Sequence, residues 1–381
     1  MGHALEIVPC LTAADMDRFV RLPLRLNAGD PAWSPPLLME RREALDPKVN
    51  PFFKHAEAAF WLVVRDGVDV GRISAQIDAL SPPNPEGRTG NFGLIAAEDD
   101  PAVFSTLLAT AEAWLRERGC VIAAGPFNLS INEEVGLLVD GFHTPPMLMM
   151  GHDPPYAGPR IEEQGYAKLK DVYAYICDTA TDIPKAARAR IERSTPRGVR
   201  LRMLNLKDYD ADVRRLTEIF NDSWAGNWGF APLTEAETQH LGKSLKLLIN
   251  PRLLWFAEID GEPAGFGVTL PNLNEAIRDL NGELFPFGIV KLLWRLKVKG
   301  LKTGRVPLMG VKRKFLAEGD GRGAMLPFLV IDAMRREALK LGIERVEMSW
   351  ILEDNRPMRR IIETVGGERY KTYRIYQKAL A

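Results

Sequence analysis

The sequence predicts an α/β protein whose two halves repeat one order of structural elements. In each half, short apolar runs with the period of β-strands alternate with amphipathic helical segments. Each half also has an Asp-Gly turn between two strand-like runs, Asp66-Gly67 and Asp260-Gly261, which indicates a β-hairpin. We therefore expect two domains, each a mixed, mostly antiparallel sheet flanked by helices.

The first half, residues 1–181, is expected to form one domain. A helix at 12–28 is followed by chain-breaking prolines, and a helix at 101–118 has one apolar face and ends at Gly119. The expected strands are residues 59–65, 69–77, 92–97, 121–125 and 167–177.

The second half, residues 198–381, follows the same order around an inserted segment at 275–304. The expected strands are 199–204, 253–259, 264–270, 306–315, 345–352 and 370–378, and the expected helices are 210–224, 234–248, 324–341 and 357–365. Residues 182–197 are basic, contain two prolines and are predicted to link the halves.

Composition narrows the class of protein. The 381 residues include 50 basic and 50 acidic side chains, so overall charge does not favour a nucleic-acid partner. The three cysteines, Cys10, Cys120 and Cys177, are far apart and form no CxxC, which argues against disulfides and against a metal site. Since no signal peptide and no apolar span is recognisable, we expect a cytoplasmic protein.

A Gly-rich loop carries the strongest chemical signal. It comprises Glu318, Gly319, Asp320, Gly321, Arg322, Gly323 and Ala324. It lies between a predicted strand and a predicted helix, where glycines let backbone N–H groups approach an anion and the helix dipole favours negative charge. The loop indicates a pyrophosphate site, with an ordinary Gly-rich turn as the alternative. The surrounding element order excludes a dinucleotide-binding βαβ unit.

Residues 306–378 resemble the core of GNAT-type acyl-CoA N-acyltransferases. The three glycines of the loop match the family's glycines, and Asn355 matches an asparagine common after the corresponding strand. The resemblance implies an acyl-CoA donor whose pyrophosphate lies on the loop, and a thioester carbonyl polarised by backbone N–H near Val311. It implies no metal.

Two positions depart from the family pattern. Glu318 replaces the leading Arg or Gln of the loop, which weakens one phosphate contact. Ile361 and Ile362 stand where the family usually has its tyrosine general acid, and Tyr373 on the last predicted strand is the expected substitute.

The first half resembles a second, degenerate copy of the same domain. Its corresponding loop, residues 96–101, has three acidic side chains and no glycine, so it should repel a pyrophosphate. The whole chain also resembles a bacterial family of GNAT-like proteins through the segments at 30–37, 50–57 and 125–142, and it is more loosely similar to bacterial ceramide synthases.

The passage at 125–150 places polar residues among apolar ones. Such side chains need partners or face a cavity, so the passage is interpreted either as an acceptor pocket or as a loop held by its own hydrogen bonds. In the first interpretation, Glu133 or Glu134 deprotonates an ammonium nucleophile, and His152 is the next candidate base.

The inserted segment begins a strongly basic stretch. Residues 285–315 contain nine Lys or Arg and no Asp or Glu, with Lys291, Arg295 and Lys299 at helical spacing. A basic amphipathic helix is typical of membrane-surface elements, although an ordinary surface helix has the same pattern. The expected partners are an anionic membrane surface at the inner face, the phosphates of CoA, or an acyl carrier protein.

Together these features predict an acyl-CoA-dependent N-acyltransferase that acts on a lipid-like amine, such as a sphingoid base. The alternatives are a small-molecule N-acetyltransferase and a catalytically silent CoA- or lipid-binding protein. A tRNA-dependent aminoacyl transferase built from paired GNAT-like domains shares the two-domain plan but should not need the Gly-rich loop.

Overall fold

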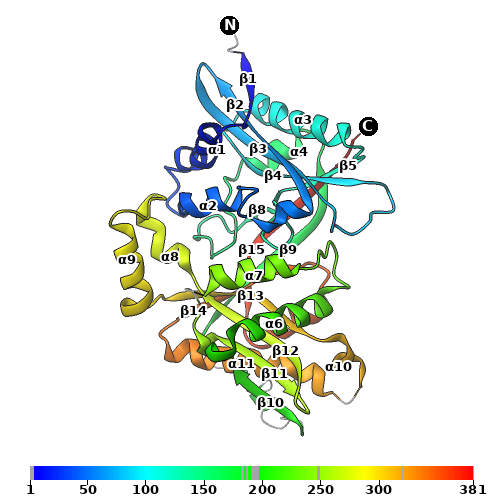
Figure 1. Ribbon diagram of the computed structural model, residues 1–381, viewed down its shortest axis with the longest axis vertical. Helices are drawn as coiled ribbons and strands as arrows, with labels where there is room; N and C mark the ends of the chain where they lie inside the picture. Colours follow the sequence, from blue (N-terminus) through cyan, green and yellow to red (C-terminus); the bar gives the residue numbers. More distant parts are fainter. Residues whose placement is uncertain are drawn as a thin grey trace. The chain divides into compact units, whose positions relative to one another are not determined.

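The computed structural model describes residues 4–181, 184–185, 188–189, 197–246, 249–319 and 321–380. The chain forms two compact units, which can be followed by sequence colour in Figure 1. Unit 1 comprises Met1–Val172, Ile277–Ile289 and Lys371–Ala381, and unit 2 comprises Tyr173–Ala276 and Val290–Tyr370. Each unit therefore takes segments from both halves of the chain, whereas the sequence-based boundaries lay at 181 and 198.

Unit 1 is a mixed sheet with the strand order β1-β2-β3-β4-β5-β15. Its strands are β1 (Leu5–Pro9), β2 (Ala56–Arg65), β3 (Val68–Asp78), β4 (Thr89–Ala97), β5 (Ile122–Gly125), β8 (Leu137–Asp140) and β15 (Glu368–Ala379). Its helices are α1 (Ala13–Leu26), α2 (Leu38–Ala44), α3 (Pro101–Glu117) and α4 (Ala157–Glu162). The apolar face of α3, including Phe104, Leu107 and Leu115, is buried in the core of this unit.

Unit 2 has the strand order β9-β14-β13-β12-β11-β10. The strands are β9 (Ala167–Asp178), β10 (Val199–Met203), β11 (Leu254–Ile259), β12 (Glu262–Pro271), β13 (Thr303–Val311) and β14 (Arg345–Leu352). The helices are α6 (Tyr209–Trp224), α7 (Glu235–Leu245), α8 (Leu273–Ile277), α9 (Gly288–Trp294), a π-helical turn (Arg295–Lys299), α10 (Arg313–Ala317), α11 (Arg322–Lys340) and α12 (Arg356–Thr364).

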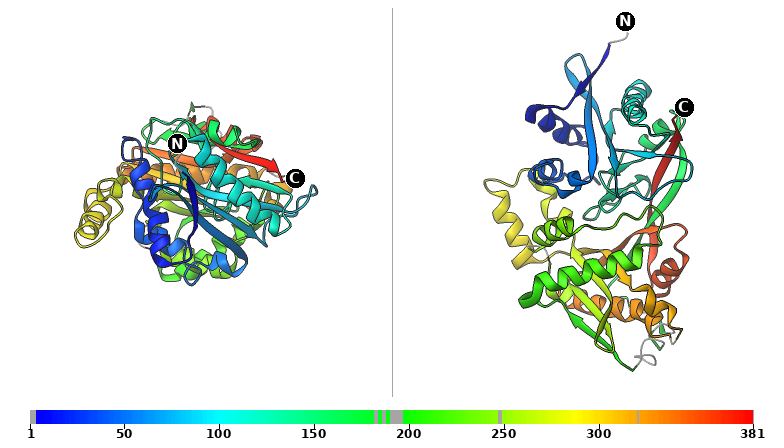
Figure 2. Two further views of the ribbon diagram at one scale, coloured as in Figure 1. Left: turned by 90° about the horizontal axis from the view of Figure 1, so that it is seen from above. Right: turned by 45° about the vertical axis from the view of Figure 1, so that its right-hand side comes forward.

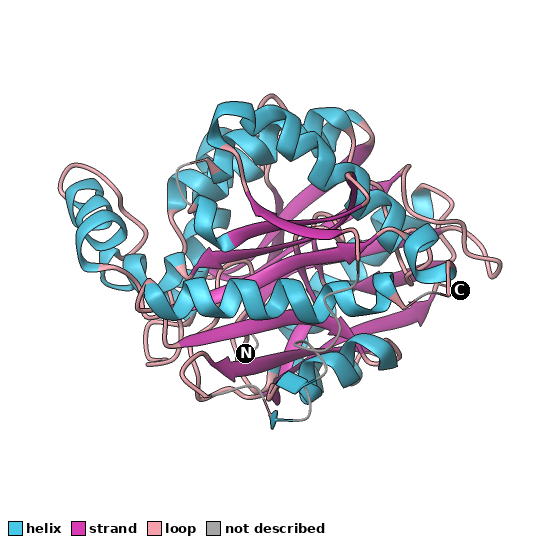
Figure 3. Cartoon of the chain, turned by 90° about the horizontal axis from the view of Figure 1, so that it is seen from below, coloured by secondary structure: helices cyan, strands magenta, loops and turns pink. Residues whose placement is uncertain are grey.

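Helices α6 and α11 cover opposite faces of the sheet in unit 2, and Figure 3 separates helices from strands by colour. A Cβ on Gly267 of β12 would lie 2.6 Å from Val330 of α11. A Cβ on Gly310 of β13 would instead lie 2.3 Å from the Oγ of Ser223 in α6. Glycine at both positions lets the two helices approach the strands closely.

The two halves exchange their last strands. Strand β9 begins in unit 1, but its residues from Tyr173 onward belong to unit 2. Strand β15 begins in unit 2, and from Lys371 onward it belongs to unit 1, where it pairs antiparallel with β5 through Tyr376 and Gly125. Figure 2 shows β15, in red, beside the green strand β9.

The predicted fold class is confirmed: both units are α/β, with mixed sheets and flanking helices. The strand predicted at 306–315 is wrong at its C-terminal end, because β13 stops at Val311 and the short helix α10 follows. The inserted segment is helical, as its periodicity suggested, but it is divided into α8, α9 and the π-helical turn. Part of the predicted linker at 182–197 lies outside the described residues.

In unit 1, the chain itself fills the gap where β4 and β5 separate. The two strands pair in parallel only from Thr89 to Asn91 on β4, although β4 continues to Ala97. Residues 127–129 lie against the unpaired part of β4: Leu94 N–H donates to the Oδ1 of Asn128 at 2.8 Å, and Gln76 donates to the carbonyl of Phe127 at 2.6 Å. The polar backbone at this separation is therefore satisfied from within the chain.

We expect Gly93→Ala to destabilise the protein. The new Cβ would lie 1.7 Å from the carbonyl oxygen of Phe127, so residues 127–129 or β4 must move. Overpacking of this kind costs about 1–3 kcal/mol of unfolding free energy. The measurement is urea denaturation. Gly29→Ala is the control, since its Cβ would meet nothing within 4 Å; equal midpoints for the two variants would contradict the close packing.

Candidate functional site

Strands β13 and β14 of unit 2 separate at the centre of the sheet. Their parallel pairing ends at Val306 and Met348, although the strands continue to Val311 and Leu352. The residue after Val306 is Pro307, which has no N–H to donate. The other edge of β13 stays paired with β12 as far as Val311, which lies opposite Gly265. The separation thus presents the edge of β13 that faces β14.

The Gly-rich loop leads into the N-terminus of α11 in the same unit. Gly319 and Gly321 have φ values of 73° and 80°, in the region that favours glycine, and Gly321 is the N-cap residue without a side-chain cap. A Cβ on Gly323 would lie 2.2 Å from the carbonyl oxygen of Phe315 in α10. Backbone conformation thus accounts for Gly319 and Gly321 and close packing for Gly323, and the N-cap glycine has no side chain with which to cap α11.

The charged side chains around the loop pair with each other. Arg322 binds Asp260 at 2.5 Å and lies 3.5 Å from Glu318. Ala324 lies in the first turn of α11, and Asp320 lies outside the described residues. Asn355 is the N-cap of α12 and accepts a hydrogen bond from Met358 N–H at 3.2 Å. Ligand contacts at these positions stay predictions.

A buried polar network spans β13, β14 and the start of β15. The Nε of Arg305 donates to the Oγ of Ser349 at 2.8 Å, and it lies 3.7 Å from the carboxylate of Glu347. Ser349 and Tyr370 also donate to Glu347. Glu347 is fully buried, and Arg305 and Ser349 are nearly so. A buried carboxylate that accepts several hydrogen bonds next to a strand separation is a candidate for proton transfer.

Sequence reasoning missed Glu347. The one available signal was an acidic residue between Val346 and Met348 in a strand that otherwise reads as buried. An ionisable side chain in such a position needs partners. Those partners, Arg305 and Tyr370, are distant in sequence and could not be assigned to it.

Aromatic rings lie beyond the last paired residues of β13 and β14. Trp224 of α6 donates from Nε1 to the carbonyl of Met309 at 3.2 Å, and its ring meets that of Trp350 edge-to-face at 5.6 Å. Phe220 packs against Trp224 at 5.0 Å. The separation is thus bordered by large apolar surfaces as well as by the buried network.

The corresponding helix N-terminus in unit 1 is occupied by carboxylates. Asp100 is the N-cap of α3 and accepts from Ala102 N–H at 2.8 Å, and it also binds Arg65. Asp99 pairs with Arg160 at 2.8 Å. The Asp100 carboxylate stands where a bound anion would stand, which favours the prediction that only the Gly-rich loop of unit 2 takes a pyrophosphate.

Glu133 and Glu134 lie in unit 1, after the segment that fills the gap beside β4. Glu134 binds Arg41 and accepts from Asn128 at 2.8 Å. Burial opposes its ionisation, but Arg41 and these hydrogen bonds hold the pKa of Glu134 below its usual value. Glu133 is half-buried, and its backbone N–H donates to Ser130. The carboxylate of Glu134 is thus engaged by Arg41 and Asn128.

His152 and Tyr373 also lie in unit 1. The Nε2 of His152 is 2.8 Å from the Oδ2 of Asp30, while its buried Nδ1 has no hydrogen-bond partner among the described residues. Burial lowers the pKa of His152, so the ring is neutral near pH 7. Burial also raises the pKa of the neighbouring Asp153 to about 7. Tyr373 is fully buried in β15, opposite Leu138.

Several residues of the basic stretch have acidic partners elsewhere in the chain. The pairs are Lys302–Glu344, Arg305–Glu347, Lys312–Glu218, Arg313–Asp222 and Lys314–Glu262. Arg295 donates to the carbonyl of Ala276 at 2.5 Å. Lys291, Lys297 and Lys299 are exposed. Intrachain pairing therefore accounts for much of the charge, and Lys291, Lys297 and Lys299 lie on α9 and the π-helical turn.

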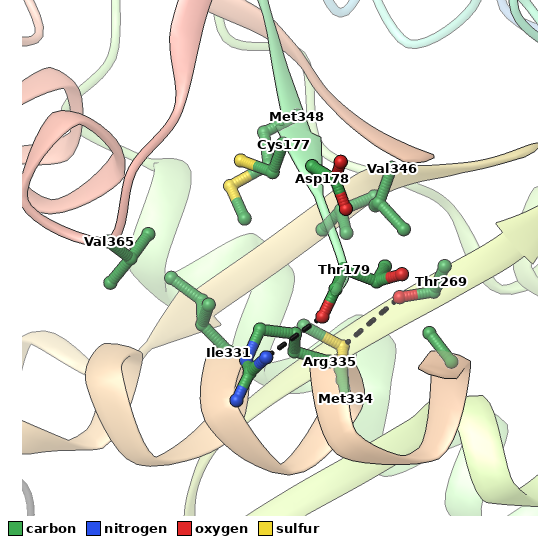
Figure 4. Close-up of a pocket in the computed structure, with 12 residues that line it drawn as sticks. Cys177, Asp178, Thr179, Thr269, Ile331, Met334, Arg335, Val346, Met348 and Val365 are labelled. Atoms are coloured by element: carbon green, nitrogen blue, oxygen red, sulfur yellow. Dashed lines mark hydrogen bonds between the residues drawn. The ribbon is translucent and has the colours of Figure 1, made fainter. Parts of the chain in front are cut away.

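An apolar cavity of about 30 Å³ lies in unit 2 between α11 and the sheet. Figure 4 shows Ile331 and Met334 of α11 and Val346 and Met348 of β14 around it. Val306 of β13 also lines this cavity, so it reaches the last paired residues of β13 and β14.

Within the described ranges, no three His, Cys, Asp or Glu side chains are grouped as a metal site would require. Of the helices described, none combines the length and apolar character needed to cross a bilayer.

Relatives and solved structures cover nearly the whole chain. It is 61% identical to the "Bacterial ceramide synthase" of Caulobacter vibrioides over 99% of this chain and 98% of that protein. It is 43% identical to "Protein YghO" of Escherichia coli over 97% and 94%, respectively. No protein-family model matches.

The solved structures share the fold at low sequence identity. A tandem GNAT protein from the clavulanic acid biosynthesis pathway matches with a TM-score of 0.57 at 15% identity, covering 99% of both chains. A GCN5-related N-acetyltransferase from Sphaerobacter thermophilus matches with a TM-score of 0.52 at 15% identity, covering 99% of this chain and 96% of that one. The predicted resemblance to GNAT proteins is confirmed at the level of the fold.

Proposed function

The chain belongs to the acyltransferase family that includes the bacterial ceramide synthase of Caulobacter vibrioides, and on this premise we propose that it transfers a long-chain acyl group from acyl-CoA to the amine of a sphingoid base. One observation carries the proposal: in unit 2 the separation of β13 and β14 occurs together with a Gly-rich N-terminus of α11, whose N-cap residue is Gly321. The strand separation suits the extended arm of acyl-CoA that ends in the thioester, and the helix N-terminus suits the pyrophosphate.

The donor is proposed to lie along β13. Backbone N–H groups of residues 319–324 hold its pyrophosphate, and the free edge of β13, near Val311, holds the arm and polarises the thioester carbonyl. Arg322 lies 3.5 Å from Glu318 and offsets its negative charge, so this acidic residue is compatible with a bound pyrophosphate. We also assign Asn355, the N-cap residue of α12, to the donor site.

The acceptor amine is proposed to react on the face that carries the buried network. An ammonium ion must lose a proton before it attacks, and we assign that proton to the carboxylate of Glu347. The neutral nitrogen then forms a bond to the carbonyl carbon and the C–S bond breaks. Tyr370, hydrogen-bonded to Glu347, is suited to relay the proton held by Glu347 to the departing thiolate, which becomes CoA thiol. The second amine proton leaves the nitrogen for solvent.

A membrane surface is proposed as the source of the lipid amine. Exposed apolar side chains alternate with lysines along residues 285–299, a segment without Asp or Glu. The exposed apolar residues are Phe285, Phe287, Val290, Leu293, Trp294 and Val298. Aromatic and apolar side chains flanked by lysines favour insertion at an anionic interface, where each lysine contributes about 1 kcal/mol of binding free energy.

The first test is turnover. Purified protein with palmitoyl-CoA and sphinganine should release CoA thiol and form the amide, detected by mass spectrometry. Gly321→Val should weaken CoA binding at least tenfold in calorimetry, because its Cβ and its φ of 80° disturb the loop. Gly342→Val, with a φ of 76° and equally open surroundings, is the control. Turnover of acetyl-CoA with small amines alone would instead support an N-acetyltransferase.

The second test concerns the base. Glu347→Gln should lower kcat by about 10²-fold or more while leaving the dissociation constant for CoA unchanged, because glutamine cannot take the proton from the amine. Since the change also removes the charge that faces Arg305, urea denaturation of the variant is measured alongside. Glu337→Gln is a matched control, since Glu337, on α11, is also buried and binds an arginine, Arg252, at 2.6 Å. Full activity of the Glu347 variant would place the base elsewhere, with Glu133 and His152 next.

The third test concerns the membrane. Wild type should co-sediment with anionic vesicles, and binding should fall steeply with salt, since the Debye length shortens from about 10 Å at 0.1 M to about 3 Å at 1 M. Replacing Lys291, Lys297 and Lys299 by Glu should abolish binding to the anionic vesicles. The same change at Lys48, Lys207 and Lys243, which are exposed elsewhere, is the control. Failure of wild type to bind anionic vesicles would refute the membrane proposal.

A further inference from the structure

We propose that the apolar cavity between α11 and the sheet of unit 2 receives the distal part of the donor's acyl chain. The inference rests on the proposed function and specifies where that function discriminates between acyl groups. Most of its lining is apolar, with Val306, Ile331, Met334, Val346, Met348 and Val365 among the residues. Asp178, Thr179, Thr269 and Arg335 complete it with polar groups.

The position of the cavity connects it to the reacting atoms. Val306 and Met348 are the last paired residues of β13 and β14, so the cavity begins where the strands separate. Their sequence neighbours Arg305 and Glu347 belong to the polar network. Because side chains alternate across a sheet, the apolar cavity and the network occupy opposite faces at the same point. A thioester held at this point therefore has an apolar side for its chain and a polar side for the amine.

The cavity is small, but flexible side chains line it and can move aside. Its 30 Å³ is about the volume that one water occupies in the liquid, so a long chain must displace side chains. Met334 and Met348 are unbranched and adapt to irregular shapes more easily than branched residues. The Sδ of Met334 accepts only a weak bond, from Thr269 at 3.6 Å. Movement of these two side chains costs few specific contacts.

The interior of the cavity is also chemically inert. Burial raises the pKa of the Cys177 thiol to about 12, so the thiol stays neutral and does not act as a nucleophile toward a thioester. At one margin, Arg335 donates to the carbonyl of Thr179 at 2.9 Å, which ties α11 to the end of β9. A hydrocarbon chain fits the apolar part of this lining.

The test is the dependence of affinity and turnover on acyl length, from acetyl-CoA through octanoyl- and dodecanoyl- to palmitoyl-CoA. In wild type, each methylene buried should raise affinity up to about fourfold. Ala338→Leu should narrow the cavity and reduce palmitoyl-CoA affinity at least tenfold while acetyl-CoA affinity is kept. Met334→Ala should widen it and move the preference to longer chains, which keeps the proposal testable if the narrowing variant does not fold.

Met325→Ala is the control, because Met325 is buried on the same helix but does not line the cavity. Equal length profiles for Met334→Ala and Met325→Ala would overturn the inference, as would a wild type whose affinity does not rise with acyl length. The proposed function fails separately: binding that rises with length, without amide formation from any amine, would leave the cavity assignment intact and refute the transferase.

Discussion

The unpaired edge of a central strand is the constraint on which the rest of the molecule depends. Backbone N–H and C=O groups away from water need partners, and both units separate two parallel strands in mid-sheet. Unit 1 meets this need with its own residues 127–129, and Asn128 reaches the N–H of Leu94. Unit 2 has a ring N–H of Trp224 on one carbonyl of β13. In one unit the gap between the strands is thus filled by the chain itself, and in the other the gap is suited to an extended ligand.

The buried charges also differ between the two units. Enclosing Arg305 and Glu347 has a large desolvation cost that their attraction repays only with good geometry and further hydrogen bonds, which Ser349 and Tyr370 provide. In unit 1, Glu134 is held ionised by Arg41. Both units thus keep a carboxylate beside an arginine, but only that of unit 2 lies at the last paired residues of the separated strands.

Local features were predictable from the sequence, and long-range ones were not. The hairpins, α3, α11 and the loop glycines follow from period, turn residues and spacing, which act over a few residues. Three findings depend on pairings between distant segments. These are the exchange of β9 and β15, the partners of Glu347, and the acidic partners of Lys302, Lys312 and Lys314. The end of β13 was misplaced because no glycine or proline stands between Val311 and the start of α10 at Arg313 to mark it.

The exchanged strands also bear on how the chain comes to be folded. During synthesis the N-terminal segments emerge first, but unit 1 lacks its strand β15 until residues 371–379 have been translated. Until then the edge of β5 that later pairs with Tyr376 is open to incorrect strand addition. Completion of the sheet of unit 1 therefore waits for a strand that is translated after most of unit 2.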